Sequence, residues 1–155
     1  LDQREMWAFC NDAAVREAIH ARPISDIGAF DECTNLDRIF YERQNPTVVA
    51  VHMELVSRGV KALVYSGDHD AVISNVGTER WIKDARLPRT HAWEAWHTPD
   101  GQVAGFCEHY EGLTYATVRG AGHAVPELKP EQALLMIQRF MKSEGGLVRD
   151  TVAAV

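Results

Sequence analysis

Two segments of this chain share one pattern, a short apolar run that ends in a glycine-containing turn with polar side chains. Residues 61–70 read Lys-Ala-Leu-Val-Tyr-Ser-Gly-Asp-His-Asp, and residues 114–123 read Thr-Tyr-Ala-Thr-Val-Arg-Gly-Ala-Gly-His. Such runs are typical of buried strands, and glycine permits the sharp turn that follows them. Polar side chains just past a strand end are where α/β proteins hold their chemistry. The two turns are therefore the first candidates for a functional site.

The elements around these turns predict an α/β fold. Helices are expected in the second half of 2–20, with Asn11 or Asp12 as cap, and over 36–41, 47–58, 77–84 and 130–141. Strands are expected at 60–65, 106–110 and 113–119, with a hairpin over 90–105 that turns at 99–101. A helix that leads through Gly59 directly into a strand is an α/β unit. The expected core stripe of the last helix is Ala133, Leu134, Ile137, Phe140 and Met141.

Composition narrows the class of protein. The 155 residues suffice for one domain with a core, and 46% hydrophobic with 25% charged residues predicts a soluble, globular chain. The formal net charge of −6 and the lack of a basic stripe argue against nucleic-acid binding. No apolar run reaches the roughly 18 residues of a membrane-spanning helix. A start at Leu1 without a signal sequence indicates a processing cut, an expression boundary or the first ordered residue.

The cysteines are odd in number: Cys10, Cys33 and Cys107. In an oxidising compartment at least one of them must pair outside this chain or stay free. The alternative for each is a small, buried hydrophobic residue. No cysteine or histidine cluster has the spacing of a zinc site, so no metal is expected.

The order of the polar residues suggests a chemistry. Asp70 precedes His123 by 53 residues, and α/β-hydrolases carry their triad in the order Ser, Asp, His. At the turns and the hairpin the sequence resembles the serine carboxypeptidase family, and the likeness covers roughly residues 6–142. With its histidine, the Gly-Asp-His-Asp stretch resembles the plant branch of the family more than the yeast or mammalian enzymes. The matching stretches are 11–21, 65–70, 77–81, 101–106, 110–115, 120–126 and 129–133.

This resemblance implies a fold and a partner. Residues 1–146 would be the C-terminal part of a single α/β-hydrolase domain, incomplete without a larger N-terminal chain, and 147–155 a tail. The family's nucleophile lies in a Gly-x-Ser-x-Gly turn, and none of the serines here has that setting. The resemblance thus implies the small chain of a two-chain enzyme, whose large chain, from the same precursor, supplies the serine and the oxyanion-hole amides. It leaves open a dimer of heterodimers.

The resemblance also assigns roles. His123 would be the general base and then the general acid, and Asp70 would orient and stabilise its ring. Each role has a plainer alternative, because a loop histidine is usually a surface residue and Asp70 could cap the following helix. Asp68 competes with Asp70 for the triad position, but a first aspartate in such a turn is expected to brace the turn. His69, between them, is expected to be solvated.

Further residues are assigned by the same likeness. Ala124 would face the pocket for the leaving C-terminal residue, and Cys33 would form a disulfide with the large chain. Cys10 and Cys107 are expected to be free, buried thiols. Trp81, Trp93 and Trp96 are core or pocket-wall aromatics, with the core favoured. Residues 71–75 lack a proline that the family often has there, which leaves the shape of this loop open.

The resemblance implies an activity. A serine exopeptidase would remove C-terminal residues from peptides through an acyl-enzyme, without a cofactor. An acyltransferase or a hydroxynitrile lyase on the same scaffold is an alternative, and a non-catalytic stabilising subunit is another. Members of the family work in vacuoles, lysosomes or the secretory path, which would suit a disulfide.

Overall fold

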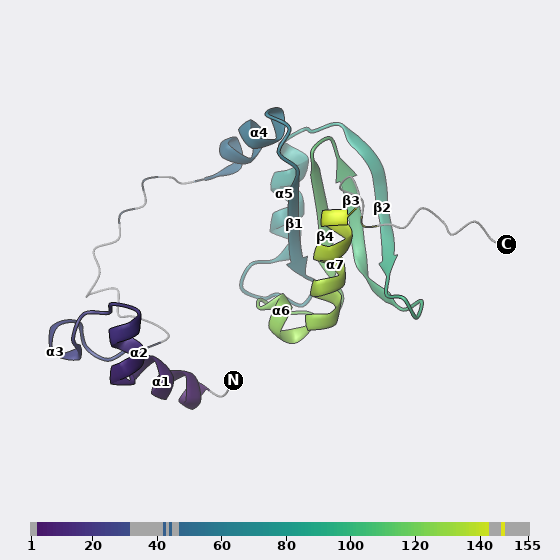
Figure 1. The fold of residues 1–155 in the computed structure, drawn as a ribbon. Helices are drawn as coiled ribbons and strands as arrows, with labels where there is room; N and C mark the ends of the chain where they lie inside the picture. The colour runs from purple at the N-terminus through teal and green to yellow at the C-terminus, as the bar shows by residue number, and fades with distance from the viewer. Residues whose placement is uncertain (1–2, 32–41, 43, 45–46, 143–146, 148–155) are drawn as a thin grey trace. The chain divides into compact units, whose positions relative to one another are not determined.

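The computed structural model describes residues 3–31, 42, 44, 47–142 and 147 (Figure 1). It divides the chain into two compact units, Leu1–Pro46 and Thr47–Val155. The helix expected at 36–41 and the disulfide expected at Cys33 lie outside the described residues, and the single domain over 1–146 stays a prediction. In the ranges that are described, no helix is long and apolar enough to cross a membrane.

The described residues of the first unit form three short helices, α1 (Gln3–Asn11), α2 (Ala13–Ala18) and α3 (Ile24–Ile27). Asp12 is the cap of α2, because its Oδ1 accepts from the amides of Ala14 and Val15 at 2.9 and 3.1 Å. The expectation of a helix only in the second half of 2–20 was wrong, since α1 fills the first half. Good helix formers such as glutamine, arginine, glutamate and alanine favour α1.

The second unit is built on a four-stranded mixed sheet in the order β1-β4-β3-β2. Its strands are β1 (Ala62–Gly67), β2 (Arg89–His97), β3 (Val103–Tyr110) and β4 (Leu113–Val118). β1 runs parallel to β4, while the β2–β3 and β3–β4 pairs are antiparallel. β4 is buried along its whole length, because it has a neighbouring strand on each side, whereas β1 lies at the edge of the sheet.

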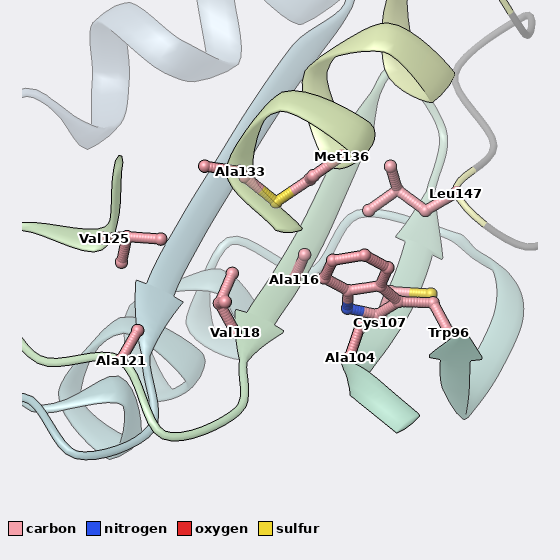
Figure 2. Close-up of a cluster of buried hydrophobic side chains, with 10 residues drawn as sticks. All are labelled: Trp96, Ala104, Cys107, Ala116, Val118, Ala121, Val125, Ala133, Met136 and Leu147. Carbon is pink, nitrogen blue, oxygen red and sulfur yellow. The ribbon is translucent and has the colours of Figure 1, made fainter. Parts of the chain in front are cut away.

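Buried side chains lie on both faces of this sheet. Met136 of α7 (Pro130–Lys142) belongs to the α7-side cluster, with Ala116 and Val118 of β4, as Figure 2 shows. Ile82 of α5 (Asn75–Asp84) belongs to the α5-side cluster, with Leu113 and Tyr115. Because side chains alternate along a strand, the two clusters occupy opposite faces. The sheet is therefore covered by α7 on one face and by α5 on the other (Figure 1).

Cys107 lies in the α7-side cluster and is fully buried. Burial raises the pKa of its thiol to about 12. The expectation of a free, buried thiol is confirmed for Cys107, while Cys10 is free and only partly buried. Trp96, in the same cluster, is 1% exposed, as its core assignment predicts.

The second arm of the hairpin expected over 90–105 and the strand expected at 106–110 form one continuous strand. β3 is continuous from Val103 to Tyr110, so the expected break between 105 and 106 was wrong. A Cβ on Gly105 would lie only 1.8 Å from the backbone oxygen of Thr117 on β4. The same oxygen accepts from the indole nitrogen of Trp96 at 2.9 Å. Gly105 therefore marks a close backbone approach inside a strand, and not the end of one.

The remaining helices begin and end near their expected positions. α4 spans Val49–Ser57, and Gly59 follows it with φ 80°, the left-handed conformation that suits glycine after a helix. The side chain of Ser74 caps α5 by accepting from the amide of Val76. α6 (Val125–Leu128) was not expected, because four residues are too few to show a helical period.

The expected core stripe of the last helix was partly wrong. Ala133 is buried and Phe140 packs against the α7-side cluster, but Leu134, Ile137 and Met141 are exposed. Met136 takes the central buried position instead. Apolar residues therefore occupy two faces of α7, and periodicity alone did not show which face meets the sheet. Leu147, expected in a tail, is buried in the same cluster, while 148–155 lie outside the described residues.

Candidate active site

The two glycine-containing turns lie at the same edge of the sheet. β1 and β4 are neighbours and parallel, and their register pairs Gly67 with Val118 at their carboxyl ends. The turn after β1 carries Asp68, His69 and Asp70, and the turn after β4 leads to His123. The parallel pairing therefore brings together residues more than fifty positions apart in the sequence.

Backbone hydrogen bonds join the two turns directly. The amide of Asp68 donates to the oxygen of Val118 at 3.2 Å, and the amide of His69 donates to the oxygen of Ala121 at 2.9 Å. A Cβ on Gly67 would lie 2.2 Å from the Ala121 oxygen and 2.4 Å from that of Gly122. Only glycine permits this approach, because the atoms in the way belong to the backbone.

Gly67→Ala should therefore force the two turns apart. We expect a loss of roughly 1–3 kcal/mol in the free energy of unfolding, typical of overpacking at a tight site. Urea unfolding of the intact protein measures this loss. Gly77→Ala is the matched control, since nothing lies within 4 Å of a Cβ on this helical glycine. Equal unfolding midpoints for the two variants would show that the turns tolerate the added carbon.

Asp70 and His123 are in direct contact. The Nδ1 atom of His123 lies 2.9 Å from Oδ2 of Asp70. The other carboxylate oxygen of Asp70 accepts from the amides of Val72 and Ile73, at 2.8 and 3.0 Å. The side chain of Asp70 is only 6% exposed, whereas that of His123 is 60% exposed. Asp70 is thus held by its own loop and presents one oxygen to the ring, while the ring remains open to an approaching group.

Hydrogen bonding determines the charge of the pair. The pKa of Asp70 is lowered, first by the bond from His123 and then by the backbone amide of Ile73. Because an ionised carboxylate only accepts hydrogen bonds, Nδ1 of His123 must carry the hydrogen of this contact. In the neutral ring Nε2 is then an acceptor. Such a pair can take a proton from a hydroxyl that approaches Nε2.

The neighbouring candidates are placed differently. Oδ1 of Asp68 accepts from the amide of Gly120 at 2.6 Å, so its carboxylate is bonded to the opposite turn. His69 is largely exposed, as expected. Ala124 is exposed beside His123 at the start of α6, and its role in substrate binding stays a prediction. Asp70 does not cap α5, because Ser74 does.

Trp81 and Trp93 lie in different surroundings. Trp81 is partly buried against the α5-side cluster, and its ring stacks on His52 with centroids 5.6 Å apart. Trp93 is 42% exposed and stacks on Phe106, with ring centroids 5.8 Å apart.

The sequence did not predict the hydrogen bond from the Gly120 amide to Asp68. The repeated turn pattern was a signal that the two segments meet, but it did not show which atoms join them.

A sequence model of the serine carboxypeptidase family matches residues 1–143. The chain therefore belongs to this family. It is 42% identical over 135 residues to serine carboxypeptidase 1 of Hordeum vulgare, covering 86% of this chain and 26% of that protein. It is 37% identical over 143 residues to serine carboxypeptidase-like 20 of Arabidopsis thaliana, covering 92% of this chain and 28% of that protein. The chain thus spans little more than a quarter of the length of these relatives.

The fold agrees with this membership. A crystal structure of a prohormone-processing carboxypeptidase from Saccharomyces cerevisiae superposes with a TM-score of 0.61 and 19% sequence identity. The superposition covers 85% of this chain and 29% of that one. The mixed α/β architecture is that of part of an α/β-hydrolase fold, as the resemblance implied.

Proposed function

We propose that this chain is the small chain of a serine carboxypeptidase and supplies the aspartate and the histidine of a Ser-Asp-His triad. The observation that carries the proposal is the 2.9 Å contact between His123 and Asp70 at the ends of adjacent parallel strands. His123 takes the proton of the serine hydroxyl and returns it to the leaving amine. Asp70 holds the ring in the productive tautomer and stabilises its charged form.

In this proposal the serine comes from another part of the precursor. Each serine that the structure describes uses its hydroxyl in a structural hydrogen bond; the partners are Asp26 for Ser25, the Glu54 oxygen for Ser57, Thr78 for Ser66 and the Val76 amide for Ser74. The nucleophile and the oxyanion-hole amides are therefore assigned to a larger N-terminal chain. This chain spans only 26% and 28% of two of its relatives, which supports a longer precursor.

The surface of the second unit supports a large partner. β1 forms one edge of the sheet and pairs with β4 alone among the strands described. Leu134, Ile137 and Met141 are 59%, 45% and 75% exposed on the outer side of α7. An open strand edge and grouped exposed apolar side chains are features that proteins usually cover. The larger chain is the proposed cover for both.

Labelling with a serine-directed fluorophosphonate tests the proposal. We expect the intact protein to form one adduct on its large chain, and then to lose the ability to release the C-terminal residue from an N-blocked dipeptide. Mass spectrometry of the separated chains locates the adduct. An intact protein that forms no adduct would support a non-catalytic stabilising subunit. An adduct without release of a C-terminal residue would support a transferase or a lyase.

The proposal includes an interchain disulfide at Cys33. We expect the two chains to migrate together in non-reducing electrophoresis of the intact protein and to separate after reduction. Cys33→Ser is the matched variant, with Cys10→Ser as control, and only the first should separate the chains without reductant. Migration of the wild-type chains as separate bands before reduction would contradict the disulfide.

A vacuolar, lysosomal or secreted location belongs to the same proposal, because disulfides persist in oxidising compartments.

A further inference from the structure

We propose that Asp68 is a positioning residue for the reaction, an inference that rests on the proposed function. Its carboxylate ties the turn that carries His123 to the turn that carries Asp70. The bond that does so runs from the amide of Gly120 to Oδ1 of Asp68 and is 2.6 Å long. Asp68 makes no hydrogen bond or ion pair with His123, and it acts through the backbone of the second turn.

The bond is suited to fixing this backbone. A hydrogen bond from an amide to a carboxylate is stronger than one to a neutral acceptor. It joins residues 52 positions apart, whereas a carboxylate that merely braces its own turn would bond within a few residues. Gly120 has φ 69° and stands three residues before His123, so this bond fixes a sharp change of chain direction just ahead of the ring.

The ring needs such support because packing does not hold it. The side chain of His123 is 60% exposed, and among the described residues Asp70 is the one hydrogen-bond partner of its ring. The direction of Nε2 is therefore set by Asp70 and by the backbone that leads to residue 123. The backbone bonds from Asp68 to Val118 and from His69 to Ala121 do not involve the Asp68 side chain. Removing that side chain should leave the turns joined but give residues 119–122 more freedom.

The test compares Asp68→Ala with Asp68→Asn in the intact protein. Asp68→Ala removes the acceptor, and we expect kcat for an N-blocked dipeptide to fall by about tenfold to a hundredfold with KM nearly unchanged, as for a misplaced catalytic group. The rate of fluorophosphonate labelling should fall by the same factor. Asp68→Asn keeps an oxygen at the same place and should recover activity to within about threefold of wild type, since the neutral acceptor makes a weaker bond.

Two further measurements separate positioning from general stability. The proton resonance of the His123 Nδ1–H group should move upfield in Asp68→Ala and stay near its wild-type position in Asp68→Asn. Asp100→Ala is the matched control. Asp100 is another turn aspartate, between β2 and β3, and its carboxylate accepts a hydrogen bond from the hydroxyl of Thr98. We expect this control to keep the wild-type kcat and the wild-type resonance.

The outcomes are distinguishable. A wild-type protein that forms no fluorophosphonate adduct overturns the proposed function, and the positioning role with it. A wild-type protein that reacts while Asp68→Ala reacts equally fast overturns the positioning role alone. Equal losses in Asp68→Ala and Asp68→Asn also overturn it, because they would show that the charge, and not the bond to Gly120, is what matters.

Discussion

Replacing His123 with alanine in the intact protein should abolish the proposed peptidase activity. We expect kcat to fall on the order of 10⁴- to 10⁶-fold, as in serine hydrolases that lose the base of the triad. Without the imidazole no group accepts the serine proton or protonates the leaving amine. The side chain is 60% exposed, so its removal leaves no cavity in either hydrophobic cluster. The free energy of unfolding should fall only by roughly 1–3 kcal/mol, because Oδ2 of Asp70 loses its hydrogen-bond partner.

Steady-state kinetics with an N-blocked dipeptide measures this loss, and urea unfolding verifies the fold. His69→Ala is the matched control, because this neighbouring histidine is even more exposed and stands between the two aspartates. It should keep kcat within a few-fold of wild type. A His123→Ala variant with activity near that of wild type would remove His123 from the proposed role.

Asp70→Asn should lower the activity nearly as much as His123→Ala does, although asparagine keeps the shape of the aspartate side chain. The amide nitrogen of asparagine can donate to Nδ1, which then becomes an acceptor and leaves the hydrogen on Nε2. A ring in that tautomer cannot take the proton of the serine. We expect kcat to fall by about 10⁴-fold, the size of the effect when a triad aspartate becomes an amide. Asp100→Asn is the control, and a loss below about tenfold in Asp70→Asn would contradict the role of Asp70.

Acidification should also distinguish wild type from Asp70→Asn. The folded state lowers the pKa of Asp70, so the contribution of this group to stability is complete above the ordinary aspartate pKa and is lost as the pH falls through the lower folded value. The difference in unfolding free energy between the two proteins should therefore be constant near pH 6 and shrink below about pH 4. A difference that grows on acidification would show that the carboxylate is not stabilised in the folded protein.

The sequence predicted the strand–turn pairs because their signals are local. The apolar runs and glycines at 61–70 and 114–123 indicate strands that end in sharp turns without any knowledge of the rest of the chain. The structure adds the contact itself, which requires the parallel pairing of β1 with β4. Neither the bond from Gly120 to Asp68 nor the close approach at Gly67 has a signature in single residues. Both depend on how two distant backbones align.

The errors at Gly105 and along α7 have one physical origin. Gly105 resembled a strand end, but it is a glycine that an adjacent strand requires. Leu134, Ile137 and Met141 resembled core residues, but α7 has apolar side chains on two faces and only one meets the sheet. In each case the deciding neighbour belongs to another element. Local pattern gives the kind of element, and tertiary packing decides which of its residues are covered.

The parallel pairing of β1 with β4 has a consequence for the order of folding. β2, β3 and β4 follow one another along the chain and pair in sequence, so they can assemble through short loops. β1 must instead close a long loop across the whole meander before it reaches β4. We therefore expect the carboxylate and the imidazole to meet late, when the meander already exists. An incompletely folded chain would then carry both groups without the contact that the proposed triad requires.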